Sequence, residues 1–148
     1  MKVIRKAKPS DVEKLHDLLT KLIQDERKYD KNIDEHFIVT NSYEEKIQKE
    51  NHFFMVLEEE GSIQGFLYGY LEDFVTKSPV AHLDALYINP SFQNQGHATS
   101  MIQEFKDWCK KHHASSIEVN VLNENKAAYH LYIKEGFLPF KSTLKQEL

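Results

Sequence analysis

The sequence predicts an α/β fold of the mixed α+β kind, in which a central sheet carries helices on both faces. Apolar residues alternate with a period of two in some segments and recur every three or four residues in others, which separates strands from helices. The resulting order is strand, two helices, three strands, helix, strand, helix, strand. Consecutive strands favour antiparallel pairing, whereas the later strand-helix-strand units favour parallel strands joined by right-handed crossovers.

Length and composition are those of a compact globular protein. The 148 residues contain no Pro/Gly/Ser-rich linker, so a single domain over residues 1–148 is expected. A formal net charge of −4 offers no basic field for a polyphosphate backbone, so nucleic acid is not an expected partner. Charges interrupt the amino-terminal apolar run and the longest apolar stretches are short, which predicts a cytoplasmic protein without a signal peptide or a membrane contact.

The first half of the chain begins with a short strand at residues 2–5 and a helix that ends near Lys28. The apolar residues of this helix recur at three- and four-residue steps and predict one buried stripe, made of Val12, Leu15, Leu18, Leu19, Leu22 and Ile23. Residues 29–41 have no clear period and are expected to form a loop. Ser42, with Glu45 three residues later, indicates a second helix over residues 42–50.

Three strands should follow. Residues 52–59 and 62–74 are apolar runs joined by Glu60-Gly61, which is typical of an antiparallel hairpin. Residues 80–88 form the next run, which stops at an Asn-Pro pair. These three segments are expected to be the centre of the sheet.

The second half alternates helices and strands. A helix is expected from His97 to about His113, with the single cysteine, Cys109, on its buried face; one cysteine allows neither an internal disulfide nor a thiolate zinc cluster. A strand at 116–121 and a helix at 125–134 follow, and residues 137–148 are extended. The histidines show no metal-ligand spacing, so no metal is expected.

The strand ending at Ile88 turns into a helix through Gln93, Gly96, Ala98 and Thr99. The first turn of a helix has unpaired N–H groups and a partial positive charge, which together suit a phosphate or pyrophosphate. Gly96 permits close approach of the backbone. Taken alone, the pattern is equally consistent with an ordinary tight turn.

Two ordered motifs make the chain resemble the GNAT N-acetyltransferases. Gln93-x-x-Gly96-x-Ala98 resembles the Arg/Gln-x-x-Gly-x-Gly/Ala signature of that family, and it follows a similar strand. The second signature lies at the expected distance and is carried by Val119, Val121, Asn125, Ala128, Leu131, Tyr132, Lys134, Gly136 and Phe137. The resemblance implies a mostly antiparallel sheet with one parallel strand pair, 80–88 and 116–121, that splays to admit acetyl-coenzyme A.

The resemblance also implies which residues bind the cosubstrate. Main-chain N–H groups of the glycine-containing loop would hold the pyrophosphate, and the strand at 80–88 would pair with the pantetheine amides. The positions implied are Leu86, Tyr87, Ile88, Gln93, Asn94, Gln95, Gly96, His97, Ala98, Thr99, Asn125 and Ala128. For Asn125, a helix cap is an equally good explanation.

The resemblance places an acid at Tyr132 and a base on the strand at 80–88. Tyr132 stands where the family commonly keeps a tyrosine that protonates the departing sulfur; the alternative is a ring that only packs between helix and sheet. His82 and Asp84 lie two apart on one strand and should share a face with Leu86 and Ile88. His82 is the first candidate for the base, because imidazole titrates nearest neutrality. The alternative is that one of the pair stabilises a bulge.

The implied activity is transfer of the acetyl group of acetyl-CoA to an amine by direct attack. The acceptor, of unknown identity, would be a small-molecule amine or a protein amino group. Acidic residues near the first helix could attract it or could be solvated surface: Asp25, Glu26, Asp30, Asp34 and Glu35. The other functional class is a non-catalytic acyl-CoA sensor or interaction module. Only eleven residues follow Phe137, so the last strand is either long and single or completed by a partner subunit in a homodimer.

Overall fold

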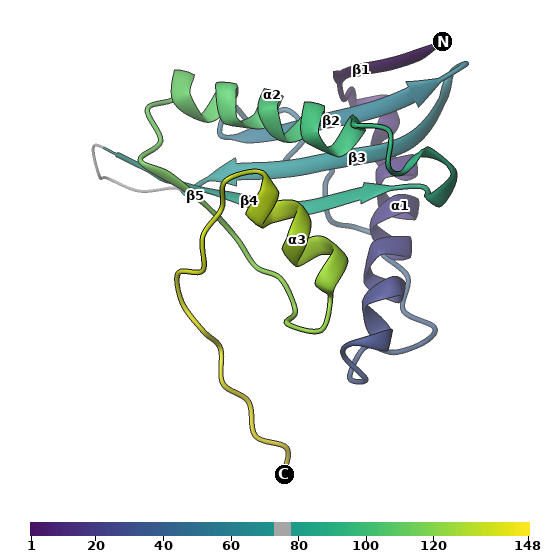
Figure 1. Cartoon of the computed structure of the whole chain (residues 1–148). Coiled ribbons are helices and arrows are strands. Elements are labelled where there is room, and N and C mark those ends of the chain that lie inside the picture. The colour runs from purple at the N-terminus through teal and green to yellow at the C-terminus, as the bar shows by residue number, and fades with distance from the viewer. Residues whose placement is uncertain (73–77) are drawn as a thin grey trace.

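The computed structural model describes residues 1–72 and 78–148 and contains one five-stranded sheet (Figure 1). The strands lie side by side in chain order: β1 (Lys2–Lys6), β2 (His52–Glu59), β3 (Ser62–Leu71), β4 (Val80–Ile88) and β5 (Ser116–Val119). β1 to β4 pair antiparallel, and β4 pairs parallel with β5. The mixed sheet and its one parallel pair confirm the predicted fold class; the last two residues of the strand expected at 62–74 lie outside the described residues.

Helices cover both faces of the sheet, as predicted. α1 (Val12–Asp25) contacts β3 and β4, and α2 (His97–Lys111) contacts β2, β3 and β4. Successive residues of β3 pack on different helices: Phe66 packs with the α1 core, and Leu67 packs with the α2 core. Because successive strand residues point to opposite faces, α1 and α2 lie on opposite sides of the sheet.

The buried residues of the two long helices lie on the faces that the sequence predicted. Val12, Leu15 and Leu18 of α1 are buried, and Cys109 lies in the α2 core with 3% of its surface exposed. Burial raises the pKa of the Cys109 thiol to about 12, which makes it an inert core residue rather than a nucleophile. A third helix, α3 (Lys126–Lys134), follows β5 and packs Leu131 against the α2 core.

The helix expected at residues 42–50 is not formed; this segment is a series of turns. Tyr43 and Ile47 are buried in the α1 core, and the buried His16 fixes the segment from α1. Its Nε2 accepts hydrogen bonds from the backbone N–H groups of Ser42 (3.3 Å) and Tyr43 (3.2 Å). Contacts with α1 thus determine the conformation of this segment, and the capping pattern of Ser42 and Glu45 does not produce a helix.

His16→Ala should lower the free energy of unfolding by about 1–3 kcal/mol, because it leaves the buried Tyr43 N–H without an acceptor; the Ser42 N–H keeps Glu44 as a second acceptor (3.1 Å). The matched change is Tyr43→Phe. The Tyr43 hydroxyl is buried and has no hydrogen-bond partner in the described part of the chain, so its removal should be neutral or stabilising. Urea unfolding of both variants tests this, and equal losses would contradict it.

Strand β4 contains a bulge, which was the alternative interpretation of His82 and Asp84. Tyr68 pairs with Ala85, but the next residue of β3, Gly69, pairs with Leu83, so Asp84 is the extra residue of β4. Ahead of the bulge Leu83 faces α2, and after it Leu86 and Ile88 face α2. The expected common face of His82, Asp84, Leu86 and Ile88 is therefore wrong: His82 and Asp84 lie on the α1 side.

The chain beyond α3 does not join the sheet. The last strand expected at residues 137–148 is not formed: these residues have no regular secondary structure and pair with no described strand. In Figure 1 this yellow segment runs past β5 and away from the body of the molecule. β5 is consequently the edge strand of the sheet.

Candidate functional site

The parallel pair separates part-way along its length. β4 and β5 are paired only from Val80 with Ser116 to Leu83 with Val119, whereas β4 continues to Ile88. Figure 1 shows the chain diverging from β4 as it runs from β5 towards α3. On the β5 side, the backbone of residues 84–88 is therefore left without a strand partner, and an extended chain with amide groups can pair there.

The start of α2 lies beyond the end of β4 and exposes main-chain donors. The N-cap residue is Gly96, with φ +83° in the left-handed region, and no side chain caps the helix. The N–H groups of the first turn thus have no intrahelical partner and no side-chain acceptor. A Cβ atom at Gly96 would meet nothing within 4 Å, so the space before the helix is open. This geometry suits an anion at the helix end.

The side chains of the preceding loop shape the loop itself. Gln93 donates through Nε2 to the Ile88 carbonyl (2.8 Å), which ties the loop to the end of β4. Gln95 donates to the Ser91 carbonyl (3.2 Å) and accepts from Lys2 Nζ (2.8 Å). Asn94 adopts a positive φ of 60°. A ligand at this loop would meet main-chain groups more than side-chain amides.

Lys2, which was not foreseen, and His97, which was, both lie near the loop. The ammonium of Lys2 reaches the loop from β1 and adds a positive charge beside it. His97 Nε2 is buried and has no hydrogen-bond partner among the described residues. A buried polar atom without a partner is uncommon, and here it lies at the first residue of the uncapped helix. In the same turn of α2, Ala98 is half-buried and Thr99 is exposed.

At α3 the structure supports the capping explanation for Asn125. Its side chain accepts a hydrogen bond from the Ala128 backbone N–H (3.2 Å) at the helix start. The Ala128 N–H is therefore already engaged. Contacts of Asn125 and Ala128 with a cosubstrate remain a prediction.

Tyr132 lies on α3 and packs against the α2 core beside Leu131. Its ring meets Phe137 edge-on, with centroids 5.7 Å apart. Burial and, to a lesser extent, the carboxylate of Glu26 raise the pKa of Tyr132 to about 12. The phenol is thus held neutral, and it is a hydrogen-bond donor at neutral pH.

A small cavity of about 70 Å³ lies where β4 and β5 separate. It is lined by Tyr70, His82, Leu83, Asp84, Glu118 and Asn120. The ring of His82 stacks on Tyr70 at 5.0 Å, and its Nε2 lies 2.6 Å from Glu72 Oε1. Glu72 therefore fixes the imidazole, and only its other nitrogen is available for another partner.

The Asp84 carboxyl lies in an environment that disfavours its charge. The residue as a whole is exposed, but neighbouring side chains bury enough of its carboxyl to raise its pKa, and Lys46 and then His82, when charged, oppose part of the rise. The hydroxyls of Tyr43, Tyr68 and Tyr70 are near enough that Asp84 adds to the rise in pKa that burial gives them. A carboxylate with a raised pKa in a small polar cavity is a candidate general base.

Sequence reasoning missed the aromatic surroundings of Asp84 and singled out Glu26 only as one of several acids. Tyr68 and Tyr70 lie on alternate positions of β3, where period-two alternation alone indicates ordinary strand residues. Glu26 follows α1, and burial together with Asp30 raises its pKa. No signal in the sequence separates it from its exposed acidic neighbours.

A family model described as Acetyltransferase (GNAT) family matches residues 15–137. The chain belongs to the GNAT acetyltransferase family. No protein of known function in the curated collection matches the sequence. Among solved structures, a variant of the BH1408 protein of Bacillus halodurans superposes with a TM-score of 0.86 at 19% identity, over 99% of both chains.

Two further structures with the fold of this GNAT chain are aminoglycoside acetyltransferases. AAC(6')-Iy in complex with CoA has a TM-score of 0.76 at 18% identity, over 100% of this chain and 95% of the other. The enzyme meta-AAC0020, from an uncultured soil metagenomic sample and in complex with sisomicin, has a TM-score of 0.72 at 19% identity over 97% of each chain. At these identities the similarity establishes the fold of the GNAT chain.

The described part of the GNAT chain contains neither a metal-binding cluster nor a membrane-spanning helix. Over residues 1–72 and 78–148, no group of three or more His, Cys, Asp or Glu side chains is arranged to hold a metal ion. In the same part of the chain no helix has the length and apolar character needed to cross a membrane.

Proposed function

We propose that this GNAT chain transfers the acetyl group of acetyl-CoA to a cationic amine, with Asp84 as the base and Tyr132 as the hydrogen-bond donor to sulfur. The observation that carries the proposal is the separation of β4 from β5 beside an uncapped helix end. Acetyl-CoA supplies an activated thioester. The residues of this chain bind it, orient the amine and move the protons.

The cosubstrate side of the site follows from the backbone. The free N–H groups at the start of α2, together with Lys2, suit a pyrophosphate, and His97 Nε2 gives a further polar contact. The unpaired backbone of residues 84–88 suits the amides of an extended pantetheine arm. Ile88 takes part only through its N–H, since Gln93 already occupies its carbonyl.

The acceptor side is acidic and aromatic. Asp84 and Glu118 line the small cavity between the strands, with Tyr70 beside them. Carboxylates attract an ammonium group, and the ring of Tyr70, stacked on His82, forms an aromatic wall beside them. The acceptor proposed is therefore an amine that is protonated in solution. Aminoglycosides, on which the named structural relatives act, belong to this chemical class.

The chemistry removes two protons from the ammonium nitrogen and supplies one to the departing sulfur. Asp84, directly or through a water molecule, takes the first proton from the ammonium, and the free nitrogen then attacks the acetyl carbon. A C–N bond forms while the C–S bond breaks, Tyr132 donates a hydrogen bond to the departing sulfur, and the second proton leaves the nitrogen and reaches the thiolate through water. Full transfer from a phenol of pKa about 12 to a thiolate of reference pKa ~8.5 would cost about 5 kcal/mol. Stabilisation of the sulfur by the hydrogen bond is therefore the main role of Tyr132.

Two measurements test the function. Calorimetry should show binding of CoA, and a thiol-reactive dye should report free CoA when acetyl-CoA is mixed with a panel of amines, aminoglycosides and polyamines included. Binding without thiol release across the panel would favour the acyl-CoA sensor. Absence of binding would reject both functions.

Tyr132→Phe should lower kcat by roughly 10–100-fold, because it removes one hydrogen bond to a group that becomes charged as it leaves. The affinity for CoA should change little, since the ring and its packing against Phe137 remain. Comparison of kcat with the calorimetric Kd separates the two effects. An unchanged kcat would leave the tyrosine a packing residue only.

A further inference from the structure

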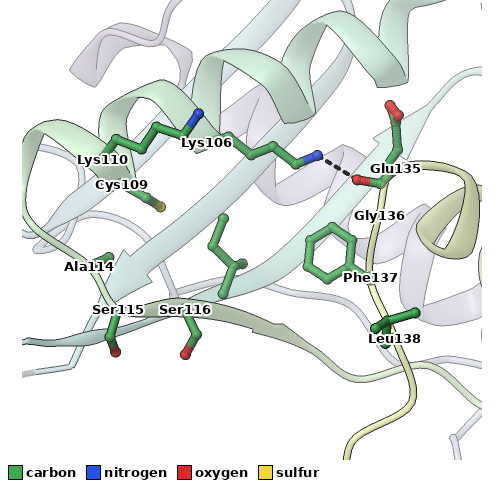
Figure 2. Close-up of a pocket in the computed structure, with 11 residues that line it drawn as sticks. Lys106, Cys109, Lys110, Ala114, Ser115, Ser116, Glu135, Gly136, Phe137 and Leu138 are labelled. Carbon is green, nitrogen blue, oxygen red and sulfur yellow. Dashed lines mark hydrogen bonds between the residues drawn. The ribbon is translucent and has the colours of Figure 1, made fainter.

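The chain carries primary amines of its own, and two of them border the largest cavity described in the structure. This cavity measures about 470 Å³ and is lined by Lys106 and Lys110 of α2 (Figure 2). Lys106 is already engaged, because it donates to the Glu135 carbonyl (2.5 Å). No residue of β4 lines the cavity, so both amines lie away from Asp84 and from the proposed acetyl-transfer site.

Lys46 is placed differently. It is half-buried and stands between the buried residues Tyr43 and Ile47 in the segment of turns that follows α1. The backbone N–H groups of Lys46 and Ile47 both donate to the Tyr43 carbonyl (3.1 and 3.0 Å), and the Tyr43 N–H is itself bonded to the buried His16. The main chain at Lys46 is therefore fixed, and the mobility that remains is that of its four-carbon stem.

The ammonium of Lys46 lies over an aromatic ring. Its Nζ is 5.8 Å from the centroid of the Tyr68 ring, which is a cation–π distance. With the residues of ranges 1–72 and 78–148, this ammonium forms neither a hydrogen bond nor an ion pair. A reaction that removes its charge would therefore break no ion pair.

Tyr68 connects Lys46 with Asp84. It pairs across the sheet with Ala85, the residue that follows Asp84 at the bulge. The ring of Tyr68 stacks on that of Tyr70 (5.9 Å), which lines the small cavity together with Asp84. Of the positive charges that oppose the rise in the pKa of Asp84, that of Lys46 has the largest effect. An amine near the proposed base and an aromatic wall is the arrangement proposed for the acceptor.

We propose that Lys46 is acetylated by its own chain when no acceptor amine is present. The inference rests on the proposed function, since it uses acetyl-CoA and the base of the same site. Asp84, directly or through a water molecule, takes one proton from the ammonium, and the free Nζ attacks the acetyl carbon. The C–N bond forms as the C–S bond breaks, and the second proton leaves the nitrogen and reaches the thiolate through water. The products are an Nζ-acetylated Lys46 and free CoA.

The test is mass spectrometry of the full chain after incubation with acetyl-CoA and no added amine. One acetyl group per chain is expected, and peptide mapping should place it on Lys46. Because the amine and the base belong to one chain, the rate should not depend on protein concentration. Lys46→Arg should lose the modification. Lys49→Arg, the matched control at an exposed position of the same segment, should keep it.

Asp84→Asn separates catalysed from chemical acetylation. This variant should acetylate Lys46 roughly 10²–10⁴-fold more slowly, whereas the slow chemical acetylation of exposed Lys49 should not change. Circular dichroism checks that each variant is folded. An unmodified Lys46 in a chain that binds CoA, equal modification of Lys46 and Lys49, or an unchanged rate in Asp84→Asn would each overturn the self-acetylation.

The outcome for the proposed function is read separately. Thiol release from acetyl-CoA with added amines can be present while Lys46 stays unmodified, and this result would reject the self-acetylation alone. A chain that binds no CoA in calorimetry would reject the proposed function and the self-acetylation together.

Discussion

Asp84→Asn is expected to lower kcat/KM by roughly 10²–10⁴-fold, which is the usual contribution of a positioned base. The same change should alter the melting temperature only slightly. Burial of the carboxyl raises the pKa of Asp84, but the residue is exposed, so solvent screens most of this effect on stability. Loss of activity without loss of stability is the signature of a residue kept for function.

The pH dependence has a defined sign. The folded chain holds the proton of Asp84 to higher pH than the unfolded chain does. The contribution of Asp84 to the free energy of unfolding therefore decreases as the pH rises from its unfolded pKa through its folded pKa. The stability advantage of Asp84→Asn should grow over that interval and then stay constant. The acidic limb of the kcat/KM profile, which lies above the ordinary aspartate pKa, should disappear in the variant.

The matched control for Asp84 is Asp107→Asn on the exposed side of α2. Asp107 accepts a hydrogen bond from Gln103 (3.0 Å) and contacts neither cavity, so its variant should match the unchanged protein in rate and melting temperature. If Asp84→Asn kept its rate, the base would have to be sought at His82 or Glu26.

Gly96→Val should weaken CoA binding by about 100-fold, which corresponds to about 2.7 kcal/mol. A β-branched residue at φ +83° is strained, so the loop changes its backbone and turns N–H groups away, or the new methyl groups occupy the open space before α2. Isothermal calorimetry gives the Kd directly. At saturating acetyl-CoA, kcat should fall much less.

Gly61→Val controls for strain. Gly61 lies in the β2–β3 turn with φ +82° and open space around its Cβ position, so it matches Gly96 in conformation and surroundings. Both variants should lose stability by a similar amount, but Gly61→Val should keep its affinity for CoA. Equal affinities in the two variants would remove the start of α2 from the binding site.

Local patterns were sufficient for much of the fold. The strands at 52–59 and 80–88 have the predicted bounds, because period-two alternation and turn residues depend on near neighbours only. The two long helices begin where their apolar stripes predict, although α2 ends two residues before His113. The helix prediction for residues 42–50 failed because the Tyr43 N–H is bonded to His16 of α1, and no local sequence pattern indicates such a distant contact.

The candidate site, too, was only partly predictable from the sequence. The sequence motif identified Gly96 and the helix start after β4, and in the structure Gly96 is the N-cap residue of α2 with a left-handed backbone. The bulge at Asp84 was foreseen only as one of two alternatives, because a bulge is a property of the pairing between β3 and β4. It reverses the face of every β4 residue beyond it. The choice between His82 and Asp84 therefore needed the coordinates.

The order of the strands has a consequence for biosynthesis. β2, β3 and β4 are joined by short connections and lie next to one another, so this meander can assemble while the rest of the chain is still on the ribosome. β5 and α3 leave the ribosome later and complete the space between the parallel strands. A nascent chain thus acquires the centre of its sheet before it acquires the proposed cosubstrate site.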